Sequence, residues 1–413
     1  MRKTQKFQEE WYVYKRKLKA LFHSLPFYIC RVFPINTHKI VMWTLEGKGG
    51  YGDSPKYIAE EIIKRNQSRK EPYEIIWLTD APTKEFPAFI RTASNSLLKR
   101  AYHLSTAAFW IGNTRTAYGT KKRRGTVYIQ TWHAIVGIKP IGKQRGNRLP
   151  GMARIVSECD SRMIDYVLSG NRWSNKMWPD GLLYDGEIIQ TGIPRCDVLF
   201  YGKEQMHRKY RMKYNLPQEV SVILYAPTFR GGNQSERRSV TADIGSLDFG
   251  KLIDALEHRF GGTWYLFLRL HPQVAEESRR IIKSEKTGRV VDVSQCADMN
   301  ELITACDVFL TDYSSSIFES ALMKQPSFLF VEDVEAYVKD RGNLLFRLEE
   351  LPFPTARDME SLQWCIERFD QARYEAHLEK FMETLGMFEN GTSSERVVDV
   401  IDKISENNGK MLT

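Results

Sequence analysis

The sequence predicts an α/β protein built from two Rossmann-like halves that face each other across a cleft. The chain has 413 residues, which suits two α/β domains better than one core. Short apolar runs alternate with helical segments up to about residue 190, and a second such series follows the turn Gly192-Ile-Pro194. We therefore expect an N-terminal arm over residues 1–33, a first domain over 34–190 and a second domain over 191–413.

In the first half, a strand is predicted at each short run of large apolar residues. These runs cover residues 39–45, 73–78, 109–112 and 127–130. The first run leads into the glycine-rich loop Gly47–Gly52, after which Ser54 is expected to cap a helix that continues through Ile63. The loop lacks GxGxxG spacing, so a tight turn with positive φ explains it as well as a phosphate-binding turn does.

The second half repeats this alternation of strands and helices. Its predicted strands cover residues 220–225, 264–270, 307–310 and 327–330, and its predicted helices cover 249–260 and 316–323. Parallel sheets of this kind bind ligands beyond the carboxyl ends of their strands. Polar residues that directly follow a predicted strand are therefore the first candidates for function.

The composition indicates a positively charged globular protein. Hydrophobic residues make up 42% and charged residues 27%, with a net charge of +9 that attracts nucleic acid, anionic lipid or phosphorylated substrates. No apolar run is long enough to predict a membrane span, and the N-terminus does not resemble a secretory signal. The six cysteines show no CxxC pairing, which argues against zinc and disulfides and favours a reducing cytoplasm. No zinc finger or RNP motif is present, which disfavours nucleic acid.

The N-terminal arm is predicted to form a basic amphipathic helix. Apolar side chains recur at three- and four-residue steps from Trp11 to Leu25, and Lys or Arg fill other positions between Lys15 and Lys19. Pro26 is expected to end the helix. Such a helix either lies in a lipid headgroup layer or packs its apolar stripe on its own domain, and the sequence leaves both possibilities open.

Two segments that follow predicted strands carry candidate chemistry. In Gln130–Gly142, His133 comes directly after a strand, where a neutral imidazole can take a proton from an attacking hydroxyl. A hydrogen-bonded structural histidine is the alternative. In Tyr225–Arg230, the Pro227-Thr228 turn and the arginine offer backbone, hydroxyl and guanidinium contacts to a phosphate, although an ordinary loop explains them too.

Two further segments in the second half suit a phosphorylated ligand. Arg269 and His271 are two residues apart in an extended segment, so their side chains point the same way and suit a pyrophosphate. Ser314 and Ser315 lie where a strand turns into a helix, whose N-terminus favours an anion. Serine is also a common helix cap, which explains part of this cluster. Glu319 is expected to accept hydrogen bonds from ribose hydroxyls.

Together and in this order, the motifs resemble the CDP-glycerol glycerophosphotransferase family of teichoic-acid synthesis. The matching segments lie between about residues 40 and 400 and are Trp132-His133-Ala134, Gly192-Ile-Pro-Arg-Cys-Asp197, Tyr225-Ala-Pro-Thr-Phe-Arg230, Arg269-Leu-His-Pro272, Thr311-Asp-Tyr-Ser-Ser-Ser-Ile-Phe-Glu319 and Asp333…Tyr337…Arg341-Gly342. The resemblance implies a GT-B fold with an acceptor-binding first domain and a CDP-donor-binding second domain. It implies no cofactor and no obligatory protein-bound metal.

The resemblance also implies roles for individual residues. The general base falls on His133, and His271 is the second catalytic residue. The implied donor contacts are Trp132, Ala134, Ile135, Val136, Arg195, Pro227, Thr228, Arg269, Leu270, Ser314, Ser315 and Glu319. Two departures stand out: Trp-His-Ala with Lys139-Pro140 is nearer to primase-like members, which add one unit to a lipid-linked disaccharide, and Glu319 replaces the commoner Asp.

The function that the resemblance implies is transfer of glycerol phosphate from CDP-glycerol to an undecaprenyl-diphosphate-linked saccharide, with release of CMP. The implied place is the cytoplasmic face of the cell membrane, where the basic arm binds an anionic surface peripherally. CDP-ribitol as the donor, or a capsule polymer as the acceptor, are alternatives within the same class. More remote are a nucleotide-sugar glycosyltransferase or epimerase and a non-enzymatic adaptor at a membrane surface or on nucleic acid. No nucleic-acid partner is expected.

Overall fold

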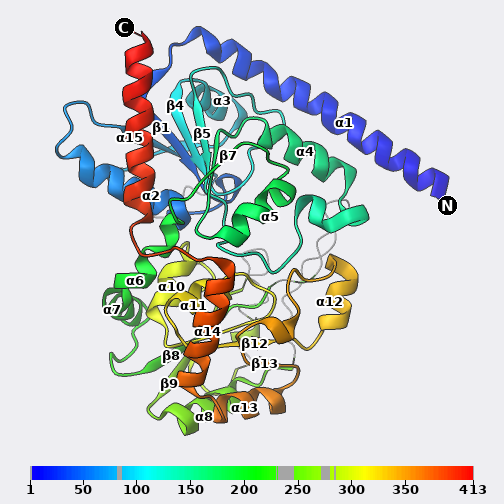
Figure 1. The fold of residues 1–413 in the computed structure, drawn as a ribbon, viewed down its shortest axis with the longest axis vertical. Coiled ribbons are helices and arrows are strands. Elements are labelled where there is room, and N and C mark those ends of the chain that lie inside the picture. Colours follow the sequence, from blue (N-terminus) through cyan, green and yellow to red (C-terminus); the bar gives the residue numbers. More distant parts are fainter. Residues whose placement is uncertain are drawn as a thin grey trace.

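The computed structural model describes residues 2–80, 86–228, 230, 246–270, 280–282 and 285–412. Its strands form two parallel sheets, one in each half of the molecule (Figure 1). The prediction of two Rossmann-like halves is therefore confirmed.

The first sheet has seven strands in the order β3-β2-β1-β4-β5-β6-β7. All neighbouring pairs are parallel. The strands are β1 (Asn36–Trp43), β2 (Glu74–Thr79), β3 (Arg91–Ser94), β4 (Ala107–Gly112), β5 (Val127–Gln130), β6 (Tyr166–Leu168) and β7 (Glu187–Ile189). Every residue of β4 is buried, as expected for a central strand of a parallel sheet that is covered on both faces.

The second sheet has six strands in the order β10-β9-β8-β11-β12-β13, again all parallel. The strands are β8 (Ser221–Tyr225), β9 (Trp264–Leu268), β10 (Val290–Asp292), β11 (Val308–Thr311), β12 (Ser327–Phe330) and β13 (Thr355–Ala356). The two sheets have the same topology. The strand that comes first in the chain, β1 or β8, is third in the sheet order, and later strands are added on both sides of it.

Helices connect and cover these strands. In the first half they are α1 (Arg2–Ile29), α2 (Asp53–Asn66), α3 (Leu97–Ser105), α4 (Gly151–Ser161) and α5 (Arg172–Leu182). The remaining helices are α6 (Val198–Tyr201), α7 (Lys203–Lys213), α8 (Phe249–Phe260), α10 (Met299–Ala305), α11 (Ile317–Leu322), α12 (Val334–Arg341), α13 (Met359–Glu367), α14 (Gln371–Leu385) and α15 (Ser393–Leu412).

Two predicted features of helix ends are wrong. Pro26 does not end α1, which continues to Ile29, because Phe27 beyond the proline is fully buried against the first half and holds the last turn in place. The second helix begins at Asp53 with Gly52 as its cap, so Ser54 lies inside the first turn. The N–H of Ser54 donates to the Asp53 carboxylate over 2.6 Å.

The C-terminal helix α15 returns to the first half, where Figure 1 shows it beside the first sheet. Arg65 and Arg69 of α2 form ion pairs with α15, at 2.7 Å to Asp399 and 2.5 Å to Asp402. A boundary near residue 190 thus separates the strands of the two sheets. Helix α15 crosses this division, because it follows the second sheet in sequence but packs on the first half. We retain residues 34–190 as a proposed first domain on the basis of the strands.

The two halves meet where α2 contacts α10. Lys56 of α2 is buried, and its Nζ lies 3.0 Å from Asp298 and 2.5 Å from Glu301. Burial lowers the pKa of Lys56, but the two carboxylates raise it overall above its ordinary value. A Cβ atom at Gly52 would lie 2.9 Å from the carbonyl oxygen of Ala297, so only glycine allows this approach. These contacts bring the carboxyl ends of both sheets together.

Helix α1 lies along the outside of the first half (Figure 1). Among the side chains described for α1, Ala20, Ser24 and Phe27 are buried. Gly119, with a φ of +102°, permits the contact, since a Cβ atom there would lie 2.7 Å from the carbonyl oxygen of Ala20. The other side of α1 is exposed and apolar, with Trp11, Tyr14, Leu18, Leu21, Phe22 and Leu25 facing outward. The apolar stripe of α1 therefore does not pack on its own domain.

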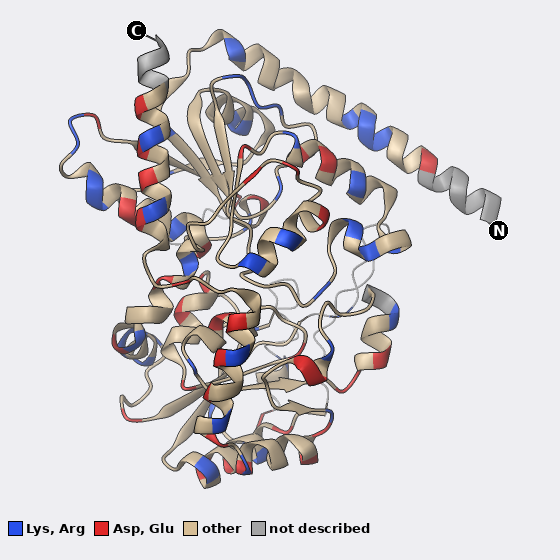
Figure 2. Cartoon of the chain, in the orientation of Figure 1, with Lys and Arg blue, Asp and Glu red and all other residues tan. Residues whose placement is uncertain are grey.

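Basic residues accompany this stripe, and Figure 2 shows Lys and Arg on α1. Within the described part of the chain, no helix combines the length and the apolar character that crossing a membrane requires. The described α1 is thus an amphipathic surface helix with both an apolar and a basic side.

Candidate active site

Each sheet has one place where the strand order changes direction, and functional residues gather at both places. In the first sheet this switch point lies between β1 and β4, and in the second between β8 and β11. Ligands of doubly wound sheets bind beyond the carboxyl ends of the strands at such points. The segments found there are 44–53 and 113–117 in the first half, and 226–228 and 312–316 in the second.

His133 follows β5, beside the first switch point. Its Nδ1 lies 2.8 Å from the carbonyl oxygen of Asn113. Because a carbonyl oxygen only accepts, Nδ1 carries the proton and donates it, and Nε2 keeps a free lone pair. Burial lowers the pKa of His133, against the opposing effects of the Asn113 hydrogen bond and the Asp53 carboxylate, while Arg195 and Arg115 lower it further. A neutral imidazole in this tautomer has the protonation state of a general base.

The indole ring of Trp132 packs against this histidine. Its ring centroid lies 4.3 Å from that of His133, and the guanidinium of Arg115 lies 5.1 Å from the Trp132 ring. The backbone of Trp132 has a φ of +52°, which is unfavourable for a large side chain. Its N–H donates to the side-chain oxygen of Gln130 over 3.0 Å, which holds this conformation. Backbone strain of this kind concentrates at functional sites.

The next three residues are buried in the core of the first half. The side chains of Ala134, Ile135 and Val136 are at most 7% exposed. The carbonyl oxygen of Ile135 accepts hydrogen bonds from Asn171 over 2.7 Å and from Ser174 over 2.8 Å. If this segment contacts the CDP-activated donor substrate, it must therefore do so through main-chain groups.

A buried chain of ion pairs connects the two halves next to His133. Arg195, in the short 3-10 helix η4 (Pro194–Cys196), lies 3.2 Å from Asp53 of α2 and also forms an ion pair with Glu319 of α11. Burial lowers the pKa of Arg195, but the carboxylates of Glu319 and Asp53 raise it overall. Glu319 is 0% exposed, and burial raises its pKa. The sequence predicts that Glu319 contacts ribose, whereas in the structure one of its carboxylate oxygens is engaged by Arg195.

The sequence motifs do not single out Asp53. The available signal was its position directly after the glycine-rich loop Gly47–Gly52, at the carboxyl end of the first strand. From the sequence alone, that loop is explained equally well by a tight turn and by a phosphate-binding turn.

The second switch point is held together by Asp312. The N–H and the hydroxyl of Thr228 each donate to its carboxylate over 2.9 Å. Arg230 lies 2.8 Å from Asp312 and 2.7 Å from Asp333. The hydroxyl and guanidinium that were expected to contact phosphate are thus engaged within the protein. Pro227 is buried beside them, and a donor contact at Pro227 and Thr228 stays a prediction.

The serines lie in the turn before α11. Ser314 and Ser315 are half-buried, and α11 begins at Ile317, one residue later than predicted. The hydroxyl of Ser314 lies 2.7 Å from that of Ser316. α11 is only six residues long. The proposed anion contact at its start therefore depends on the serine side chains and the turn more than on a helix dipole.

Arg269 follows β9, and its Nη2 donates to the carbonyl oxygen of Cys296 over 3.2 Å. Its Nε has no hydrogen-bond partner among the described residues. Burial lowers the pKa of Arg269. Leu270 is buried, and its N–H donates to the Ser294 hydroxyl over 2.9 Å. His271 lies outside the described residues, so its predicted place beside Arg269 stays a prediction.

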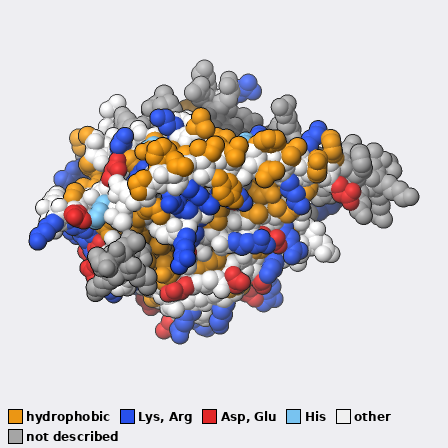
Figure 3. Space-filling model, turned by 90° about the horizontal axis from the view of Figure 1, so that it is seen from above, with side chains coloured by type: hydrophobic (Ala, Val, Ile, Leu, Met, Phe, Trp, Pro, Cys, Tyr) orange, Lys and Arg blue, Asp and Glu red, His pale blue; other side chains and the backbone are white. Residues whose placement is uncertain are grey.

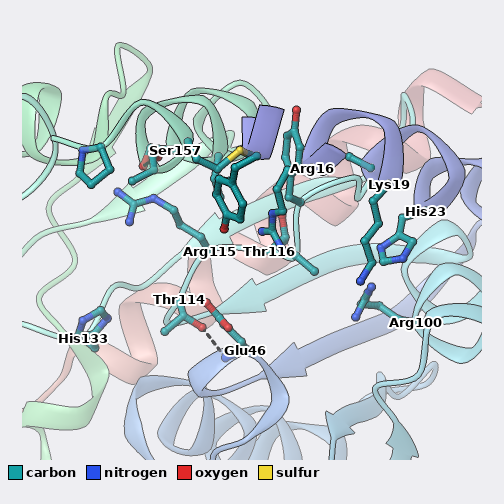
Figure 4. A pocket seen from close by; sticks show the side chains of 18 of the residues that line it. Arg16, Lys19, His23, Glu46, Arg100, Thr114, Arg115, Thr116, His133 and Ser157 are labelled. Atoms are coloured by element: carbon teal, nitrogen blue, oxygen red, sulfur yellow. Dashed lines mark hydrogen bonds between the residues drawn. The ribbon is translucent and has the colours of Figure 1, made fainter. Parts of the chain in front are cut away.

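A cavity of about 1080 Å³ lies beneath α1 and reaches His133 (Figure 4). Its walls come from α1, the segments after β1 and β4, α3, α4 and the loop after β5. The cationic lining residues are Arg16, Lys19, Arg100 and Arg115, and Glu46 is the one carboxylate among the described lining residues. In the same described part of the chain, no three His, Cys, Asp or Glu side chains are grouped to hold a metal ion.

Comparison with known proteins identifies the family. The model of the CDP-Glycerol:Poly(glycerophosphate) glycerophosphotransferase family matches residues 26–403. The chain is 28% identical over 377 residues to the teichoic acid poly(glycerol phosphate) polymerase of Staphylococcus epidermidis, covering 88% of this chain and 50% of that protein. It is 30% identical over 311 residues to the teichoic acid ribitol-phosphate primase of Bacillus spizizenii, covering 73% of this chain and 76% of that protein.

A solved structure gives the same result for the fold. The wall teichoic acid polymerase TagF, as a variant soaked with CDPG, superposes with a TM-score of 0.78 at 27% identity and covers 98% of each chain. The predicted fold of two Rossmann-like halves is thereby confirmed against an experimental structure. Because the family model spans most of the chain, this protein belongs to the CDP-glycerol:poly(glycerophosphate) glycerophosphotransferase family.

Proposed function

We propose that this protein transfers glycerol phosphate from CDP-glycerol to a hydroxyl of a lipid-linked saccharide in teichoic-acid biosynthesis and releases CMP. Membership of the family supports the reaction, and similarity to TagF soaked with CDPG supports a CDP-activated donor. The chain spans half the length of the Staphylococcus epidermidis polymerase. The activity of that longer protein therefore enters here as a proposal.

The observation that carries the mechanism is the hydrogen bond from His133 Nδ1 to the Asn113 carbonyl. It leaves Nε2 free to take the proton of the acceptor hydroxyl while that oxygen attacks the β-phosphorus of the donor. The bond between the β-phosphorus and the bridging oxygen breaks, and CMP leaves with that oxygen. Arg269, Ser314, Ser315 and His271 are proposed to stabilise the charge that develops on the diphosphate.

Turnover of the two CDP-alcohols tests this proposal. The full chain is incubated with a lipid-linked saccharide and either CDP-glycerol or CDP-ribitol, and CMP release is followed together with the mass of the lipid product. CDP-glycerol is expected to yield CMP and an acceptor heavier by one glycerol phosphate. CMP release without any gain in acceptor mass would indicate donor hydrolysis and would contradict the transfer reaction.

CDP-ribitol is the second candidate donor. It is favoured by the 30% identity to a teichoic acid ribitol-phosphate primase over most of this chain. Faster CMP release from CDP-ribitol than from CDP-glycerol, with a product heavier by one ribitol phosphate, would assign the protein to ribitol transfer. The acceptor would be the same class of lipid-linked saccharide.

We further propose that α1 binds the anionic cytoplasmic surface of the cell membrane. The face of the molecule seen from above in Figure 3 carries a band of hydrophobic side chains with Lys and Arg beside it. Leu21 and Phe22 of α1 are 67% and 64% exposed. A helix with apolar side chains on one face and basic side chains next to them binds the headgroup region of anionic lipid.

Replacing Leu21 and Phe22 together with Asp is expected to weaken binding to phosphatidylglycerol vesicles by about 10- to 100-fold, because two large apolar side chains are lost from the lipid contact. Co-sedimentation with vesicles measures this. Met212→Asp is the matched control, since Met212 is also 67% exposed but lies on α7 in the second half. Equal vesicle binding by all three proteins would contradict the membrane role of α1.

A further inference from the structure

The cavity beneath α1 has two chemically different ends. Figure 4 shows His133 at one end, and Arg16, Lys19, His23 and Arg100 gathered on the side away from it. Arg115 lies between these groups and contacts the ring of Trp132. The end with His133 is the reacting end in the proposed mechanism. The distal end is a concentration of positive charge that this mechanism does not use.

The distal cations keep donor atoms without a partner among the described residues. Nε of Arg16 and Nε of Arg100 are buried and make no hydrogen bond to any described residue. Nη1 of Arg100 donates to the carbonyl oxygen of Asn95 over 3.1 Å and to its side-chain oxygen over 3.5 Å. Burial lowers the pKa of His23, and the charges of Lys19, Arg100 and Arg16 lower it further. Like charges crowded in this way are stabilised when an anion binds among them.

Helix α1 connects this cluster to the surface that we propose binds lipid. Arg16 and Lys19 of α1 line the cavity, whereas Leu21 and Phe22, on the outward side of the same helix, are exposed. A lipid-linked saccharide has a fixed chemical order: lipid, then diphosphate, then sugar, then the reacting hydroxyl. The structure presents matching features in the same order, from the apolar outer side of α1, through the cationic cluster, to His133.

We propose that Arg16, Lys19 and Arg100 bind the diphosphate of the acceptor and thereby place its terminal hydroxyl at His133. This inference deepens the proposed function and rests on it. Guanidinium groups recognise phosphate oxygens through paired N–H donors, which suits Arg16 and Arg100. The cavity then selects acceptors that carry a diphosphate and a hydroxyl separated by the distance between its two ends.

The test is the double variant Arg16→Gln/Arg100→Gln, studied in the full chain with inorganic pyrophosphate as the probe. Binding is measured by calorimetry in the presence of saturating CMP, which blocks the donor site. The dissociation constant for pyrophosphate is expected to rise by about 10- to 100-fold, the effect of losing charge-assisted hydrogen bonds. Lys17→Gln is the matched control, because Lys17 is on α1 but exposed and outside the cavity lining. Arg16→Lys/Arg100→Lys should restore part of the affinity.

Kinetics give an independent measurement of the same site. The double variant is expected to raise KM for the lipid-linked acceptor by a similar factor, with KM for CDP-glycerol unchanged. Thermal unfolding checks that the variant is folded. Pyrophosphate that fails to bind the wild-type chain, or that binds the double variant equally well, would overturn the assignment.

A lipid headgroup is the other source of phosphate that the cluster could meet. If the double variant loses binding to phosphatidylglycerol vesicles while its affinity for pyrophosphate is unchanged, the cations bind headgroups and the acceptor site is disproved. Failure of the proposed function looks different: the wild-type chain would release no CMP from CDP-glycerol or CDP-ribitol, whatever its affinity for pyrophosphate.

Discussion

Replacing His133 with alanine is expected to lower the turnover number by about 10²- to 10⁴-fold, which is the usual contribution of a general base. The donor affinity should remain near the wild-type value, because the free Nε2 faces the acceptor hydroxyl in the proposed mechanism. CMP release with a saturating lipid-linked acceptor measures the turnover number. Calorimetry with CDP-glycerol measures donor binding.

The pH profile makes this prediction sharper. Burial holds the pKa of His133 below its ordinary value of 6.5, so the imidazole is neutral and active at and above that pH. As the pH falls through the lowered pKa, the ring gains a proton and cannot accept another. The wild-type rate should therefore decline only in acid, below pH 6.5, and this decline should be absent from the residual rate of the alanine variant.

A matched control tests whether the loss of rate is specific to His133 or follows the loss of any histidine. His258 is exposed on α8 in the second half, far in sequence from the site, and His258→Ala is expected to keep the wild-type rate and pH profile. A His133→Ala variant that turns over at nearly the wild-type rate would contradict the general-base role. The hydrogen bond to Asn113 would then be a structural contact.

The central strands of both sheets could be predicted from the sequence, because burial on two faces requires continuous apolar runs. β4, β8 and β11 are such runs, and each was placed within three residues of its observed bounds. The short strands β3, β6, β7, β10 and β13 were missed. β3, β7 and β10 have no buried residue, so their sequences carry no apolar signal. β6 and β13 include buried residues but are only three and two residues long, too short to show a pattern.

The residues of the candidate site also fall into those that a local sequence motif reveals and those that only the fold brings together. His133 follows a predicted strand, and its local motif was sufficient to find it. The pairing of Arg195 with Asp53 and Glu319 joins residues 142 and 124 positions apart, which no local pattern contains. The cavity cations come from α1, α3 and the segment after β4, so only the folded chain brings Arg16, Arg100 and Arg115 together.

Replacing Arg195 with methionine is expected to destabilise the protein by about 3–5 kcal/mol, because it leaves a buried carboxylate without its cation. Glu319 is 0% exposed and already carries a pKa that burial raises. The midpoint of thermal unfolding measures the loss. Arg208→Met is the control, since Arg208 lies exposed on α7 and its replacement should leave the midpoint unchanged.

The loss of stability in the Arg195→Met variant should depend on pH. A carboxyl group whose pKa is raised in the folded state binds its proton more tightly when folded, so folding is favoured as the pH falls. Removing Arg195 takes away the nearest charge that opposes this rise. The loss of stability in the Arg195→Met variant should therefore be largest at neutral and alkaline pH and shrink as the pH falls and Glu319 takes up its proton.

A second substitution distinguishes the buried charge from lost packing. Arg195→Met/Glu319→Leu removes both partners and leaves an apolar pair of similar volume, which should recover a large part of the lost stability. Asp53 then keeps its hydrogen bond to the Ser54 N–H and is partly exposed, so it does not require the guanidinium to stay charged. A double variant as unstable as Arg195→Met would show that the arginine acts through packing, and that its own ion pairs contribute little.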